Sequence, residues 1–173
     1  MKLRDKLHID IEEFFSTGKF DHLKLGKSKE WVINNFPDPD GYDDEEDILN
    51  DDIWTYGNVE LHFYKEELVL IYSEGITNLN GGDSIDIRKG ILGSDRECDL
   101  NRIMSYLNQR HIDFRKKTHN VGSYSIDLIL ESGVKLAFQL EQNDIEGHEM
   151  FLERCKTTNQ DDFKLVTFSL TND

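Results

Sequence analysis

The sequence predicts an α+β domain, built from a mostly antiparallel sheet of about six strands in hairpins and from three or four helices. Two patterns indicate this fold class. Apolar residues recur at helical spacing in some segments and alternate with polar residues in others. The chain has 173 residues, with 37% hydrophobic residues and ten Phe, which is enough for a core. We therefore expect a single domain over residues 1–173, with lobes at 1–90 and 91–173 as an open alternative.

Helices are predicted where apolar residues recur three or four positions apart or where a capping residue precedes such a run. Asp99 is followed by apolar residues at i, i+3, i+4 and i+7, a pattern typical of an amphipathic helix. Ser28 is an N-cap residue, and Pro37 ends the helix that follows it because the residue before proline is disfavoured in the helical region. The predicted helices are residues 3–16, 28–36, 99–110 and 149–156.

Strands are predicted from alternation with a period of two. Val59, Leu61 and Phe63 alternate with polar residues, which indicates a half-buried strand. The run 68–72 is apolar on both faces and is expected at the centre of the sheet. Gly133 occupies a turn that joins two alternating runs into a hairpin. The predicted strands are residues 59–64, 68–72, 84–88, 112–115, 124–130, 134–140 and 163–170.

The two halves of the chain resemble each other in outline, because each contains a helix followed by a hairpin. Residues 56–63 with 68–71 are similar in pattern to residues 122–129 with 136–138. This similarity suggests two pseudo-repeated helix-plus-hairpin units, which either share one sheet or pack as two lobes. The alternative is that half-buried hairpins simply look alike.

Negative charge is concentrated in one window of the sequence. The chain has a net charge of -15, and residues 30–64 contain eleven Asp and Glu but no Lys or Arg. Such a charge disfavours nucleic acid and anionic membranes as partners and favours a basic protein. The alternative is that the acidity only aids solubility. The sequence lacks an apolar run of the roughly 18 residues that a membrane span requires, so we expect a cytoplasmic protein.

The sequence predicts no catalytic residue, no cofactor and no metal site. Cys98 and Cys155 fit no zinc or redox spacing and are expected to be reduced. The six histidines are scattered without the i, i+4 spacing of a zinc helix. The acidic run around Gly41 resembles a calcium loop, but alignment on this glycine places Phe36 at the first ligand position. The sequence also lacks a nucleophile elbow and a phosphate-binding loop.

Recognition of a partner is the remaining hypothesis. Carboxylates would steer a basic protein toward the acidic segment, and aromatic side chains would supply contact area. Trp54 and Tyr56 have the alternative of being core residues. The predicted partner-binding residues are Asp38, Asp40, Tyr42, Asp43, Asp44, Glu45, Glu46, Asp47, Asp51, Asp52 and Tyr56.

A family resemblance points in the same direction. The run Ile53-Trp54-x-Tyr56-Gly57-x-Val59-Glu60-Leu61-x-Phe63, followed by Leu68-x-x-Ile71, is similar to a pattern in small bacterial proteins of unassigned function. These proteins are often encoded near polymorphic or contact-dependent toxin systems, and some of their neighbours are immunity proteins. The resemblance covers about 45 residues, from Ser28 to Tyr72. It implies a non-enzymatic protein that binds and blocks a toxin domain.

Two other functions stay open at this point. One is an enzyme or a metal-binding protein of an unrecognised type, which would have a deep pocket with converging polar groups. The other is a self-associating domain, which would have an exposed apolar patch.

Overall fold

The computed structural model describes residues 6–41, 48–93, 98–119, 125–140, 147–159 and 162–172. Four α-helices and nine strands form in this part of the chain. The helices are α1 (Ile11–Thr17), α2 (Lys29–Asn35), α3 (Leu100–Gln109) and α4 (His148–Thr157). The strands are β1 (Leu7–Asp10), β2 (Ile53–Tyr56), β3 (Val59–Tyr64), β4 (Glu67–Glu74), β5 (Ile85–Arg88), β6 (Phe114–His119), β7 (Ser125–Leu130), β8 (Lys135–Gln139) and β9 (Lys164–Thr171). Three short 3-10 helices are η1 (Ile48–Asn50), η2 (Ile76–Asn78) and η3 (Gly90–Gly93).

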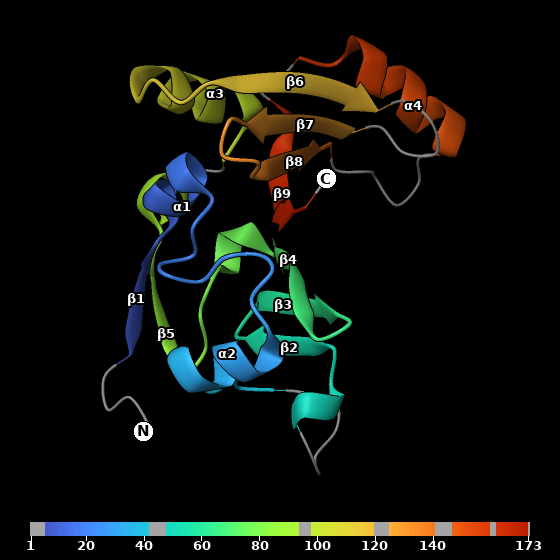
Figure 1. The fold of residues 1–173 in the computed structure, drawn as a ribbon. Coiled ribbons are helices and arrows are strands. Elements are labelled where there is room, and N and C mark those ends of the chain that lie inside the picture. Colours follow the sequence, from blue (N-terminus) through green and yellow to red (C-terminus); the bar gives the residue numbers. More distant parts are fainter. Residues whose placement is uncertain are drawn as a thin grey trace.

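One seven-stranded antiparallel sheet organises the molecule, in the order β2-β3-β4-β9-β8-β7-β6. The predicted α+β class is therefore confirmed. The last strand, β9, lies between β4 of the first half and β8 of the second half. In Figure 1, β2 and β3 lie near α2 at one end, and β6 and β7 lie near α3 and α4 at the other end. Each half thus contributes a three-stranded meander to one shared sheet, β2-β3-β4 from the first half and β6-β7-β8 from the second.

The N-terminal segment differs from the prediction. Residues 3–16 were expected to form one helix, but Leu7–Asp10 form β1, which pairs in parallel with β5. Helix α1 begins only after Asp10, whose carboxylate accepts hydrogen bonds from the backbone N–H groups of Glu12 and Glu13. The spacing of the apolar residues from Leu7 onward fits both structures locally. Pairing with β5 favours the strand.

The other predicted elements form with small shifts in their bounds. Ser28 and Asp99 cap α2 and α3 through their side chains, as predicted. The hairpin of β7 and β8 turns at Gly133, which has a φ of 88°. The strand expected at 112–115 begins two residues later and is longer, because Phe114 to His119 pair along the whole of β7. The strand expected at 84–88 lies in the separate two-stranded sheet, as β5.

The core connects the two ends of the chain. The ring of Phe14 in α1 lies 5.5 Å from the ring of Phe168 in β9 and 5.5 Å from that of Phe20, in edge-on contacts that stabilise aromatic pairs. All three side chains are fully buried. The start of α3 is joined to the residue before β9, because the N–H of Leu100 donates a hydrogen bond of 3.0 Å to the carbonyl of Phe163. These contacts hold both halves of the sheet in one core.

Candidate protein-binding surface

The predicted binding residues divide into three groups. Tyr42 and residues 43–47 lie outside the described residues. Asp38, Asp40 and Asp52 are exposed at the β2 end of the sheet. Asp51 and Tyr56, in contrast, are buried. The expectation of a contact surface is thus wrong for these last two side chains.

Tyr56 belongs to the core. Its side chain is 0% exposed, and its hydroxyl donates a hydrogen bond of 2.8 Å to the carbonyl oxygen of Pro37. Burial raises the pKa of Tyr56, and the charges of Asp38 and Asp40 add to this effect, so the phenol stays neutral. The ring packs edge-on against Phe36 at 5.5 Å. Tyr56 therefore fixes the Pro37 segment to the sheet from within and presents nothing to a partner.

Asp51 and Trp54 form an internal contact at the beginning of β2. The indole N–H of Trp54 lies 3.1 Å from the carbonyl oxygens of both Ile48 and Asp51. The carboxylate of Asp51 accepts a 3.4 Å hydrogen bond from the N–H of Ile53. Because Asp51 is 8% exposed, its charge serves the turn before β2 rather than the surface. Trp54 is a core residue, the second of the two interpretations that the sequence allowed.

Asp40 is exposed and also braces three loops. Its carboxylate oxygens accept hydrogen bonds from the N–H of Gly57, at 2.8 Å, and from the N–H of Asp83, at 3.0 Å. The backbone N–H of Asp40 donates to the carbonyl of Thr55, and the N–H of Thr55 donates to that of Gly41. The segment around Asp40 therefore covers the free edge of β2. This carboxylate has a structural role, whatever else it contacts.

Lys29 is a buried charged side chain that the sequence gave no reason to notice. It is 1% exposed, and its ammonium donates hydrogen bonds to the carbonyl of Leu49 at 2.9 Å and to the carboxylate of Asp52 at 2.8 Å. Glu66 is the third partner, at 3.5 Å. Lys29 thus joins α2, η1 and the β3–β4 turn, and it holds two exposed carboxylates beside one another.

Three large apolar side chains are exposed on the elements at this end of the sheet. Leu49 is 40% exposed, Ile53 is 39% exposed and Tyr64 is 63% exposed. Each is close in the sequence to a partner of Lys29. Leu49 itself supplies the carbonyl that Lys29 contacts, Ile53 follows Asp52, and Tyr64 is two residues before Glu66. We name Leu49, Asp52, Ile53, Tyr64 and Glu66 the η1 surface. No pattern in the sequence marked these residues as a surface, and their exposure is seen only in the structure.

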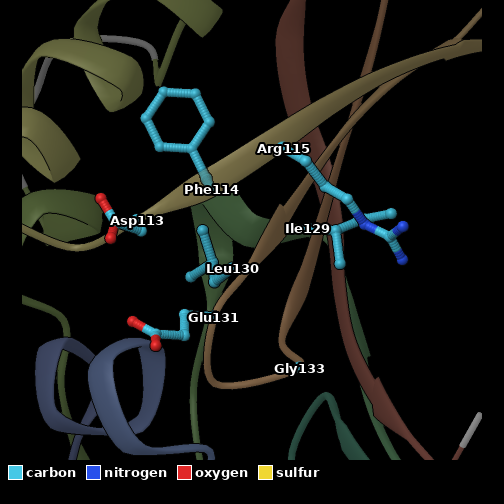
Figure 2. A pocket seen from close by; sticks show the side chains of 7 residues that line it. All are labelled: Asp113, Phe114, Arg115, Ile129, Leu130, Glu131 and Gly133. Carbon is cyan, nitrogen blue, oxygen red and sulfur yellow. The ribbon is translucent and has the colours of Figure 1, made fainter.

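A hollow of about 360 Å³ lies at the other end of the sheet, between β6 and β7. It is lined by Asp113, Phe114, Arg115, Ile129, Leu130, Glu131 and Gly133. Figure 2 shows Arg115 pointing away from the carboxylates of Asp113 and Glu131. The polar groups that line the hollow therefore do not converge on one point, as an acid–base site would require.

The remaining candidates for chemistry are engaged in internal contacts. Burial is the main cause that raises the pKa of the Cys98 thiol, which opposes thiolate formation, and Cys155 is buried. His119 contacts the carboxylate of Asp127 at 2.9 Å, and His62 contacts that of Glu60 at 2.7 Å. Among the described residues, no group of three or more His, Cys, Asp or Glu side chains could hold a metal ion.

In that same part of the chain, every helix is too short or too polar to cross a membrane.

Comparison of the chain with protein-family models, with curated proteins and with solved structures finds no match. The functional conclusion therefore rests on the chain's own residues.

Proposed function

We propose that the protein is a non-enzymatic binding protein of the immunity type, which neutralises a basic toxin domain through the η1 surface and the acidic segment that precedes it. The observation that carries this proposal is the combination of exposed apolar side chains with unbalanced negative charge. The exposed residues Leu49, Ile53 and Tyr64 all lie within residues 30–64, which contain eleven carboxylates.

The cations that flank this window directly in the sequence, Lys29 and Lys65, leave its charge largely uncompensated. Lys29 is buried and already contacts Asp52 and Glu66. Lys65 is exposed and lies 5.2 Å from the ring of Tyr64. A basic partner would meet exposed carboxylates at Asp38 and Asp52, which raise the association rate by electrostatic steering.

The exposed apolar side chains supply binding free energy that charge alone does not. Partly exposed aliphatic and aromatic groups at the centre of an interface provide most of the binding free energy, while a polar rim excludes water. The buried Lys29 anchor stabilises this arrangement before binding, which lowers the entropy cost of ordering the surface. The basic partner that fits this surface has a shallow apolar patch bordered by Lys and Arg.

The product of the adjacent gene is the ligand to test. We expect a complex in isothermal titration calorimetry at low salt, with an affinity that falls as the salt concentration rises. The variant I53A/Y64A should weaken binding at least tenfold at any salt concentration. The variant D43N/D44N should weaken it mainly at low salt. The variant E149Q/E153Q, which removes two exposed charges from α4, is the matched control and should bind like the wild type.

Two results would contradict the proposal. One is the absence of a complex with the product of the adjacent gene at low salt. The other is a complex that I53A/Y64A and D43N/D44N leave unchanged, since binding would then use a different surface.

A further inference from the structure

The seven-stranded sheet has two edges, and they differ in how they end. The edge at β2 is covered, because the backbone of Asp40 and Gly41 hydrogen bonds to Thr55. The edge at β6 has no further strand beside it in the described part of the chain. An open edge offers unpaired backbone N–H and C=O groups to any extended segment of suitable chemistry. The edge strand β6, at the top of Figure 1, is therefore available for pairing in a way that β2 is not.

The open edge is basic in an acidic molecule. Arg115, Lys116 and Lys117 are consecutive and exposed, whereas the chain as a whole has a net charge of -15. Within the described residues, none of the three forms an ion pair with a carboxylate. The nearest acidic residue across the ladder is Asp127, which lies opposite Lys117, but its carboxylate is 9% exposed and contacts His119 at 2.9 Å. The cations of β6 are thus left for an outside partner.

The cations follow the period of a strand. Arg115 and Lys117 lie on one face of β6, because alternate residues of a strand share a face. Their spacing is about 7 Å, which is two residues of an extended chain. A strand added beside β6 has the same period, so carboxylates at alternate positions would each lie opposite one of these side chains. The match of period and charge specifies the occupant.

We propose that β6 is a docking edge for an extended acidic segment of a partner protein, with Asp or Glu at alternate positions, which adds to the sheet as an eighth strand. The hollow beside Asp113 and Glu131 sets one end of this segment, since these carboxylates repel further acidic side chains there. Phe114, Ile129 and Leu130 line the same hollow and favour an apolar residue next to the acidic run. This inference is independent of the proposed function, which concerns the opposite end of the sheet.

Edge lysines also have a purely protective interpretation, because they deter pairing with neutral or basic strands. The two interpretations differ for an acidic strand, which protection would not attract. Nucleic acid is the other anionic ligand with a comparable spacing. It is disfavoured because its charge continues beyond a six-residue strand into a molecule of net charge -15.

The test uses the full-length protein and a synthetic peptide in which Glu alternates with Val or Thr. Binding is measured by fluorescence anisotropy at low salt, and hydrogen exchange locates it. We expect micromolar affinity, slower exchange of amides in residues 114–119, and a loss of at least tenfold in the variant R115E/K117E. The variant K19E/K24E, which reverses two exposed cations between α1 and α2, is the control and should bind like the wild type.

Three further comparisons make the test decisive. A peptide of the same composition with its glutamates in one block should bind at least tenfold more weakly, as should an alternating peptide whose backbone amides are N-methylated. Equal binding of either would overturn strand addition. Tighter binding of a single-stranded oligothymidylate than of the peptide, with the same dependence on Arg115 and Lys117, would replace the proposed partner with a nucleic acid. Absence of peptide binding, with circular dichroism showing a folded protein, would leave β6 with protection alone and refute the proposal.

Discussion

The buried ammonium of Lys29 gives the sharpest prediction about stability. Lys29 and its partners differ in burial, since the side chain of Lys29 is 2% exposed while those of Asp52 and Glu66 are 68% and 67% exposed. Removing a carboxylate leaves a buried cation with fewer partners. Removing the cation returns both carboxylates to water. We therefore expect D52A to cost at least as much stability as K29M, although the lysine is the buried member.

The magnitudes follow from these contacts. D52A removes a charge-assisted hydrogen bond of 2.8 Å and leaves the carbonyl of Leu49 at 2.9 Å and Glu66 at 3.5 Å. A hydrogen bond to a charged group contributes about 1.5–3 kcal/mol, and we expect this loss in the free energy of unfolding. K29M keeps the apolar packing of the side chain and should cost about 1–2 kcal/mol. The double variant should cost no more than K29M, because Asp52 then has no ammonium to contact.

Urea unfolding followed by tryptophan fluorescence measures these values, because the buried Trp54 lies next to the anchor. The cycle of K29M, D52A and the double variant should give a coupling free energy of about 1.5 kcal/mol or more. D83A, which removes another exposed carboxylate, is the control and should change stability by less than about 0.5 kcal/mol and add to K29M. Additive effects of K29M and D52A would refute the reasoning, as would a neutral D52A.

Three further predictions concern the loops and the titrating groups. D40A should lower the free energy of unfolding by about 1–3 kcal/mol, because the N–H groups of Gly57 and Asp83 lose their acceptor. Urea unfolding measures this loss. The control D40N keeps one acceptor oxygen and should cost less. Y56F should be less stable than the wild type by about 1 kcal/mol at pH 8. The folded state raises the pKa of Tyr56 above its ordinary value of 10.0. The stability advantage of the wild type over Y56F is therefore complete below pH 10 and falls by about 1.4 kcal/mol per pH unit above it. A stability difference that does not change with pH would contradict the burial of this phenol. The thiol of Cys98 should react with Ellman's reagent at pH 8 more slowly than the same thiol in urea, since burial raises its pKa; equal rates would show that the site is open.

Local signals predicted much of the secondary structure. Ser28 and Asp99 cap helices by bonds to backbone groups a few residues away, and Gly133 supplies a positive φ within its own turn. Such interactions depend on neighbours in the sequence, so the sequence alone reveals them. The concentration of carboxylates in residues 30–64 is likewise a property of the sequence.

The candidate site was predicted only in part. Asp38, Asp40 and Asp52 are exposed as expected, but Tyr56 lies with Trp54 on the buried face of β2, where its hydroxyl donates to the carbonyl of Pro37. A period-two pattern predicts that a side chain alternates in direction, and it does not say which face is covered. The burial of Lys29 was not predictable either, since its three partners come from η1, the start of β2 and the β3–β4 turn.

The sequence by itself determined where helices and strands alternate, where helices are capped and where negative charge gathers, because each of these depends on residues close together in the chain. Only the tertiary structure decided that Leu7–Asp10 pair as a strand, that β9 joins the two halves of the sheet and that β6 is the outermost strand among the described residues. Strand pairing exchanges hydrogen bonds between distant segments, and a partner that is distant in the sequence leaves no mark on the local pattern.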